Sequence, residues 1–150
     1  MRGVIQRVSS ASVSVNGKSI ANIKNGLVIL LGIEQEDTIE DAKWFAGKVS
    51  KLRIFSDENE NVNFSINEVK GDIILVSQFT LHAKTKKGNR PSFIRAASPD
   101  YAEKLYLETR DLFASLIQGN VQTGEFGANM NVELVNNGPV TLIIDTKNKE

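Results

Sequence analysis

Hydrophobic and polar residues alternate along the first part of the chain in the manner of β-strands. Valines alternate with serines over 12–15, and Asn16-Gly17 is a typical tight hairpin turn before a return strand over 18–23. The next segment, 27–33, is almost continuously apolar. A run of this kind predicts a central strand that is covered on both faces.

Apolar residues then recur at three-to-four-residue spacing, which predicts two helices. The first is expected over 38–52, with Asp37 or Thr38 as its N-cap. The second begins at Ser98-Pro99, where serine caps the helix and proline occupies its first turn, and it ends before Gly119.

The remaining apolar segments are strand-sized. Short strands are expected over 53–55 and 73–76, and two more over 130–135 and 140–145, which Asn136-Asn137-Gly138-Pro139 would join as a hairpin turn. This order of strands and helices predicts a single α+β domain over 1–150, with mixed or barrel-like sheets and two main helices. The polar tail, 146–150, is expected to fray.

Composition limits the chemistry that the chain can perform. Of 150 residues, 41% are hydrophobic and 24% charged, as in soluble globular proteins. No cysteine is present and His82 is the single histidine, so we expect no metal, no cofactor and no disulfide. The longest apolar run, 27–31, is far too short to cross a membrane, and the N-terminus lacks the apolar core of a signal peptide. A cytoplasmic protein is expected.

The charges balance, with 18 basic and 18 acidic residues, but they are unevenly distributed. Segment 82–99 contains no acid, and two interpretations of it stay open: a solvated loop, or a basic face that binds a polyanion. The candidate RNA-binding residues are Lys84, Lys86, Lys87 and Arg90, with Arg95 further along the same segment.

Two segments could carry function. In Ser77-Gln78-Phe79-Thr80-Leu81, two hydroxyls and an amide follow an apolar strand, and backbone N–H groups at such a strand end could stabilise an oxyanion, an effect of roughly 3–4 kcal/mol per donor. A plain sheet edge is the alternative. Gly138-Pro139 could form a stiff bend instead of a hairpin turn, since proline permits a cis bond and glycine permits close approach. Catalysis by His82 is not expected, because a lone histidine beside a strand end is usually structural.

These segments together resemble the D-aminoacyl-tRNA deacylase family. The family's SQFTL motif stands at 77–81 and its Gly-Pro motif at 138–139. Three further stretches match in the expected order, so that the resemblance spans essentially residues 1–145. They are Gln6-Arg7-Val8, Lys87-Gly88-Asn89-Arg90-Pro91-Ser92-Phe93 and Thr123-Gly124-Glu125-Phe126-Gly127-Ala128-Asn129-Met130.

The resemblance implies a homodimer that hydrolyses the ester bond of D-aminoacyl-tRNA. A cis Gly138-Pro139 bond, held by Arg7, would enter the partner subunit's site and hold the substrate's α-amino group. An L side chain would then collide with this bend, whereas glycyl-tRNA would be accepted. The terminal adenosine would lie near Phe79 and Met130.

Two mechanisms for this reaction and two other functions remain open. The catalytic segment is expected to comprise Ser77, Gln78, Phe79 and Thr80, either with Thr80 as nucleophile or with backbone N–H groups and the ribose 2′-hydroxyl activating water. The resemblance favours the second. A nucleic-acid-binding module without catalysis, using the basic loop, is an alternative function, and a general esterase using Ser77 or Thr80 is another.

Overall fold

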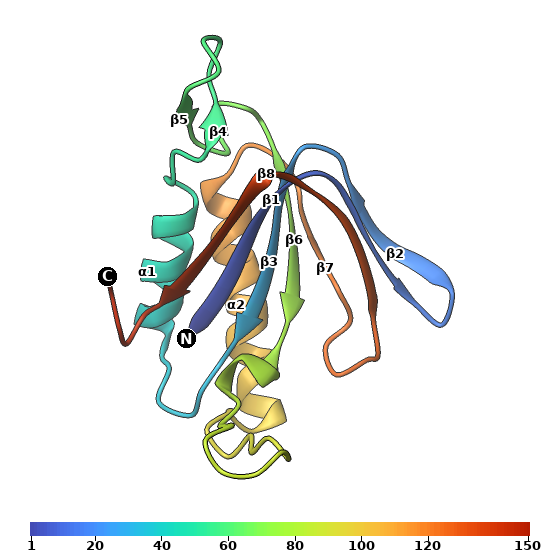
Figure 1. Cartoon of the computed structure of the whole chain (residues 1–150), viewed down its shortest axis with the longest axis vertical. Helices are drawn as coiled ribbons and strands as arrows, with labels where there is room; N and C mark the ends of the chain where they lie inside the picture. The colour runs from blue at the N-terminus through green and yellow to red at the C-terminus, as the bar shows by residue number, and fades with distance from the viewer.

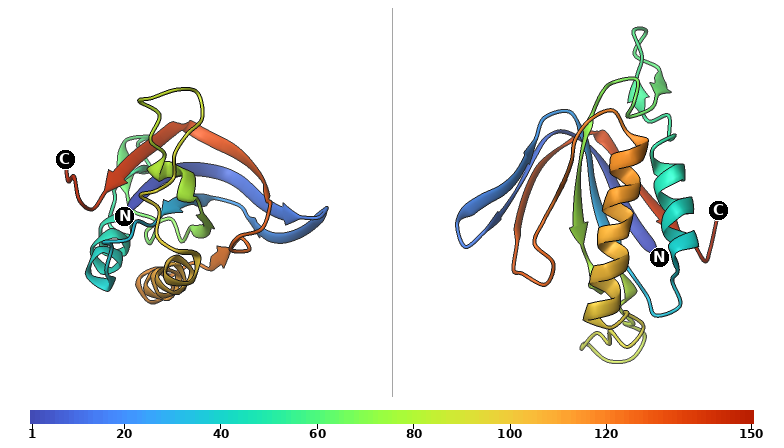
Figure 2. Two further views of the ribbon diagram at one scale, coloured as in Figure 1. Left: turned by 90° about the horizontal axis from the view of Figure 1, so that it is seen from below. Right: turned by 180° about the vertical axis from the view of Figure 1, so that it is seen from behind.

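A curled mixed sheet packs against two helices in the computed structural model, which describes residues 1–150 (Figure 1). The two helices lie side by side along one face of the sheet (Figure 2). The main sheet is formed by β1 (Arg2–Val15), β2 (Lys18–Ile23), β3 (Gly26–Gly32), β6 (Asp72–Ser77), β7 (Val121–Thr123) and β8 (Asn131–Asp145). The other elements are α1 (Ile39–Val49), β4 (Phe55–Ser56), β5 (Val62–Phe64), the 3-10 helix η1 (Phe79–His82) and α2 (Pro99–Leu116).

The expected α+β architecture with two main helices is confirmed. The strand order is β2-β1-β3-β6-β7, and β8 pairs with β1. β1 runs antiparallel to β2, β3 and β8, whereas β3, β6 and β7 are parallel to one another. The sheet is nearly closed into a barrel, and Gln122 of β7 bridges to β2 on the other side of the gap. Its side-chain oxygen accepts from the N–H of Asn22 at 2.8 Å, and its side-chain N–H donates to the carbonyl of Asn22 at 2.8 Å.

β3 is the central strand that its apolar sequence predicts. It lies between β1 and β6, and its residues contribute to two separate cores. Leu27, Ile29 and Leu31 face the helices, whereas Val28 faces the hollow of the curled sheet together with residues of β1 and β2. A strand buried on both faces has no polar position to spare, which explains its continuous apolar pattern.

Both helices form where the spacing predicts them, with shorter ends. α1 begins after Thr38, whose backbone N–H donates to Asp41 at 2.9 Å, and it ends at Val49 instead of Leu52. α2 has Ser98 as its N-cap with proline in the first turn, as expected, and it ends at Leu116.

The hairpin predicted over 136–139 is wrong. β8 is one long strand, and both of its halves pair with β1, with Val8 opposite Asn136 and Gln6 opposite Thr141. The register shifts on either side of Val8, so the four residues form a bulged bend within a single strand. The Gly138-Pro139 peptide bond within this bend is cis.

The start of the C-terminal tail is also more ordered than expected. Thr146 is buried, and its N–H donates to the carbonyl of Met1 at 2.9 Å. The Lys147 ammonium donates to Asp41 on α1 at 2.9 Å. The tail is therefore anchored through Lys147, because its first residues find partners on the neighbouring elements.

Candidate active site

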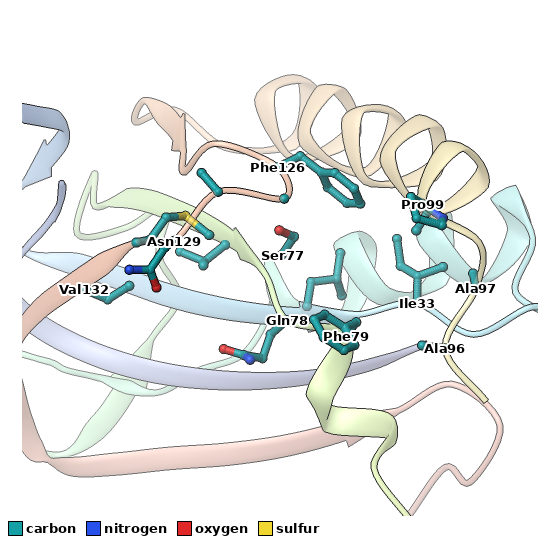
Figure 3. Close-up of a pocket in the computed structure, with 16 residues that line it drawn as sticks. Ile33, Ser77, Gln78, Phe79, Ala96, Ala97, Pro99, Phe126, Asn129 and Val132 are labelled. Atoms are coloured by element: carbon teal, nitrogen blue, oxygen red, sulfur yellow. The ribbon is translucent and has the colours of Figure 1, made fainter. Parts of the chain in front are cut away.

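A cavity of about 470 Å³ opens at the end of β6, between the 3-10 helix η1 and the start of α2 (Figure 3). Ser77, Gln78 and Phe79 form its floor. The segment before α2 adds Ala96 and Ala97, which lie beside Phe79. The remaining lining residues are Leu31, Ile33, Val76, Pro99, Ala102, Phe126, Gly127, Ala128, Asn129, Met130 and Val132.

The strand before the SQFTL segment ends within one residue of the predicted position, 73–76. β6 stops at Ser77, and the N–H of Gln78 makes one last ladder bond to the carbonyl of Leu31 at 2.8 Å. The chain then turns into η1, a 3-10 turn that the sequence pattern did not predict. Because the first N–H groups of a helix have no acceptor inside it, those of Phe79 and Thr80 are available to a ligand. No side chain caps this end of η1.

Gln78 and Thr80 are joined within the site. The side-chain amide of Gln78 donates to the hydroxyl oxygen of Thr80 at 2.5 Å. Thr80 itself is half-buried and does not line the cavity, in contrast to the three residues before it. This bond fixes the orientation of the threonine side chain beside the cavity.

Phe79 presents an exposed aromatic ring at the cavity. Its side chain is 57% exposed, and its ring meets that of Phe93 edge to face at a centroid distance of 5.1 Å. Met130 also lines the cavity, and its sulfur packs so closely on Gly124 that a Cβ there would collide with it. The site therefore offers apolar surfaces suited to a planar ring.

The cavity contains no ionisable side chain. The titratable group behind the cavity wall is Tyr106. Burial raises the pKa of its phenol, although the neighbouring Arg110 opposes the shift. That hydroxyl donates to the carbonyl of Leu75, and its ring packs on Phe126, so its role is to support the wall. No group of three or more acids and histidines is placed to hold a metal ion.

The basic loop follows η1 directly. An antiparallel bridge between Lys84 and Ser92 closes its base, and Lys84, Lys86, Lys87 and Arg90 are all exposed without ion-pair partners in the chain. Phe93 ties the loop to the exposed ring of Phe79. Four free cations thus lie on the loop between η1 and the segment that leads into α2.

The Gly138-Pro139 bend lies far from this cavity in the same chain. Arg7 fixes it from β1, with its Nη1 donating to the carbonyl of Ile54 at 2.6 Å and its Nε to that of Asn137 at 3.1 Å. Gly138 and Pro139 are both exposed. The predicted site residues therefore form two groups, one at the cavity and one at the bend.

His82 is buried at the end of η1, in agreement with a structural role. Neither of its ring nitrogens has a hydrogen-bond partner. Sequence reasoning missed this burial, and it also missed Ala96, Ala97 and Phe126 as parts of the cavity. Small and apolar residues in loops give no chemical signal in a sequence.

No helix of the structure has both the length and the apolar character needed to cross a membrane.

Comparison with known proteins gives concordant results. Residues 4–145 match the family described as D-Tyr-tRNA(Tyr) deacylase. Proteins named D-aminoacyl-tRNA deacylase from Flavobacterium johnsoniae and Phocaeicola vulgatus are 55% and 57% identical over 150 residues, covering all of both chains. Among solved structures, the c-Myc DNA Unwinding Element Binding Protein is 37% identical with a TM-score of 0.91, covering 97% of this chain and 98% of that one. A probable eukaryotic D-amino acid tRNA deacylase, 19% identical with a TM-score of 0.82 and covering 95% and 97%, shares the fold.

Proposed function

The chain belongs to the D-Tyr-tRNA(Tyr) deacylase family, and from this premise we propose that it removes D-amino acids from tRNA at sites completed by a second copy of itself. It is an enzyme, a D-aminoacyl-tRNA deacylase that hydrolyses the ester between an amino acid and tRNA. The proposal concerns how that site is assembled, how it rejects L-amino acids and which groups perform the reaction.

Strand register supports a site built from two chains. Arg7, which holds the bend, pairs with Leu27, and Leu27 pairs with Ile73 near the start of β6. Ser77 lies four residues further along β6, on the far side of β3. At about 3.3 Å per residue, the bend on β8 and the SQFTL segment are separated by roughly 13 Å along the strands and, through β1 and β3, by three strand spacings across them. The two segments are therefore apart within one chain, and in the proposed site they come from different chains.

The exposed surface of β8 favours the same arrangement. Val135 and Ile143, which flank the bend on this strand, have 56% and 72% of their surface exposed. Large apolar side chains on a regular strand are a typical interface for a second copy. A two-fold pairing through β8 would carry each bend to its partner and bury these residues.

Chiral selection follows from the stiffness of the bend. In the proposed complex, the carbonyls at Gly138 and Pro139 hold the substrate's α-amino group, and the ester lies against η1 of the other subunit. With these two groups fixed, a D side chain points to open space, whereas an L side chain collides with the bend backbone. Glycine has no side chain to exclude, so glycyl-tRNA, including glycine mischarged on tRNA-Ala, is also a substrate in this proposal.

The reaction itself relies on main-chain donors. The N–H groups of Phe79 and Thr80 polarise the ester carbonyl and stabilise the developing oxyanion. No side chain lining the cavity can act as a base, so the ribose 2′-hydroxyl of the tRNA assists the attacking water. Gln78 orients the Thr80 hydroxyl, which contributes a hydrogen bond without acting as nucleophile.

The cavity and the loop divide the recognition of RNA between them. The terminal adenosine enters the apolar cavity beside Phe79 and Met130, where rings and backbone groups hold single-stranded 3′ ends well. The exposed cations of the basic loop contact phosphates of the acceptor stem. Affinity for tRNA therefore falls as salt rises, as it does whenever bound phosphates release counterions.

The observation that carries the proposal is a cavity at the SQFTL segment with no ionisable lining. Its test is to incubate the enzyme separately with D-tyrosyl-tRNA, L-tyrosyl-tRNA and glycyl-tRNA. Release of tyrosine from the D-form and of glycine, with the L-form intact, is expected. Release of both tyrosine enantiomers, together with cleavage of small activated esters, would indicate a general esterase instead.

A nucleic-acid-binding module without turnover is the second candidate, and the basic loop favours it. One structural neighbour is titled as a DNA Unwinding Element Binding Protein. Retention of DNA duplexes or tRNA without release of any amino acid would support this candidate. Release of D-tyrosine excludes it as the sole function.

A further inference from the structure

The single histidine of the chain occupies an unusual position at the end of η1. The side chain of His82 is fully buried, yet neither Nδ1 nor Nε2 has a hydrogen-bond partner. Its ring packs on Gly32 of β3, where an added Cβ would come within 3.0 Å of the imidazole. Burying a polar group without a partner is costly. A stable protein keeps such a group only where another arrangement gives it a partner or where packing compensates for the loss.

The one carboxylate within 4 Å of His82 is already engaged. Oε2 of Glu34 lies 3.9 Å from His82 Nδ1, too far for a hydrogen bond. The same oxygen accepts a hydrogen bond from Nη2 of Arg95 at 3.0 Å. The other oxygen, Oε1, lies 3.9 Å from the amino group of Met1. Only 12% of the Glu34 side chain is exposed. Arg95 is the one side chain that donates a hydrogen bond to its carboxylate.

Arg95 is well placed to leave this carboxylate. It belongs to the acid-free segment that includes the basic loop, and 47% of its side chain is exposed. Guanidinium groups bind phosphate in the same two-pronged way as they bind carboxylate. The residues that follow, Ala96 and Ala97, form the cavity wall and are pinned to the segment of Glu34 and Ile33 by main-chain bonds. The wall can therefore stay in place while the arginine side chain turns outward.

If Arg95 left, the largely buried carboxylate of Glu34 would lose its hydrogen-bonded counter-ion, which is strongly unfavourable. The amino group of Met1 is equally near but already donates to Asp37 and Thr146. His82 has no such partner, and a shift of about 1 Å would bring its Nδ1–H within hydrogen-bond distance of Oε2. We propose that Glu34 exchanges Arg95 for His82 when Arg95 binds an RNA phosphate, so that occupancy of the basic loop fixes η1 in place. His82 is then a positioning residue, and this inference rests on the RNA-binding role proposed above for the loop.

Selective labelling of histidine tests the exchange directly, because the chain contains only one. Nitrogen-15 spectra of the imidazole are recorded for the full-length protein alone and with an uncharged acceptor-stem RNA hairpin. The RNA should produce a hydrogen-bonded Nδ1 proton that exchanges slowly with water. Arg95→Gln should produce the same signal without RNA, whereas Arg110→Gln on α2 should leave the spectrum unchanged.

The RNA titration and the Arg95→Gln variant test the proposed RNA site and the exchange separately. Failure of the hairpin to bind, measured by fluorescence anisotropy, would refute the RNA role of the loop, while Arg95→Gln alone would still test the exchange. An unchanged imidazole in Arg95→Gln overturns the exchange. Tight RNA binding that leaves the imidazole unchanged overturns it as well.

Kinetics with two substrates distinguishes positioning from a merely structural role. His82→Leu removes the reserve donor, and the KM for D-tyrosyl-tRNA should rise about tenfold, corresponding to the loss of one hydrogen bond. For D-tyrosyl-adenosine, which has no acceptor-stem phosphates, kcat/KM should change less than about threefold. His82→Gln, which keeps an N–H donor, should restore most of the KM for tRNA. An equal loss on both substrates would mean that His82 only supports the fold.

Discussion

Arg7 and Asn137 are joined by two hydrogen bonds, from Nε to the main-chain carbonyl at 3.1 Å and from Nη2 to the side-chain oxygen at 3.2 Å. The same guanidinium reaches the carbonyl of Ile54, so one buried side chain connects β1, the bend and the segment before β4. The planar fork of arginine suits this three-way contact. Arg7 therefore fixes the position of the bend from outside the bend's own sequence.

Arg7→Lys should loosen the bend while keeping the charge. A lysine ammonium cannot reproduce the fork, and each lost bond to a charged donor is worth about 1.5–3 kcal/mol. We expect a lower melting temperature and at least a tenfold smaller ratio of D-tyrosyl-tRNA to L-tyrosyl-tRNA hydrolysis. The ratio is measured as kcat/KM for both substrates. A lower melting temperature with an unchanged ratio would show that Arg7 contributes only to stability.

Gly138→Ala should impair the site without needing to alter any catalytic group. The φ of Gly138 is 127°, which L side chains rarely adopt, and an added Cβ would lie 2.9 Å from Nη2 of Arg7. The bend must shift to accommodate it. We expect hydrolysis of D-tyrosyl-tRNA to fall roughly 100-fold, since displacements of about 1 Å in positioning groups have effects of this size.

Gly17→Ala provides the matched control for this substitution. Gly17 also has a positive φ, of 76°, but nothing lies within 4 Å of the position of its Cβ. The control should lose some stability and retain its activity. Equal loss of activity in the two variants would contradict the role assigned to the bend.

Thr80→Ala tests the nucleophile. The hydroxyl oxygen accepts a hydrogen bond from Gln78, and no ionisable side chain lines the cavity to remove its proton. We therefore expect single-turnover hydrolysis of D-tyrosyl-tRNA to stay within about tenfold of the parent enzyme, whereas removal of a true nucleophile costs more than a thousandfold. A loss of that larger size, with trapping of an acyl-enzyme in the parent protein, would establish the covalent route.

Asp41 makes the fold sensitive to acid. Partial burial raises the pKa of its carboxyl, but hydrogen bonds from Lys147, Thr146 and Thr38 outweigh burial and hold the pKa well below its ordinary value of 3.8. A depressed folded-state pKa contributes stability that is present above about pH 4 and lost as the pH falls below it. Asp41→Asn should therefore lower the melting temperature at pH 7 and flatten its decline between pH 4 and pH 2.

Glu40→Gln on the same helix is the control, because its carboxylate is 74% exposed and pairs only with Lys43. Exposed pairs of this kind contribute little. The melting curves of this control should follow those of the parent protein throughout the pH range. A parallel shift of the Asp41→Asn curve at every pH would exclude titration of Asp41 as the cause.

The elements that sequence reasoning located correctly are those with a strong local pattern. The apolar run 27–33 predicts a strand covered on both faces, and α1 and α2 repeat their apolar residues at helical spacing. Their ends were less accurate, as for the C-terminus of α1, because fraying and capping depend on neighbouring elements. Very short strands such as β5 and β7 have too few residues to show a period.

The error at 136–139 has a different origin. Asn-Asn-Gly-Pro between two alternating segments fits a hairpin equally well, since a local pattern does not specify which strand each segment pairs with. Long-range pairing with β1 decided the outcome. The candidate site shows the same limit. The polar residues at 77–80 were identified by their chemistry, whereas the burial of His82 and its relation to Glu34 arise only in three dimensions.

The distance between the bend and η1 has a genetic consequence in the proposed pair of chains. Each site would combine the Gly138-Pro139 of one chain with the Phe79 and Thr80 of the other. Two inactive proteins, one damaged at the bend and the other at η1, would then complement each other when mixed. Half of the randomly reassembled pairs would be heterodimers. In each heterodimer one of the two sites combines an intact bend with an intact η1, so about a quarter of the original activity would return.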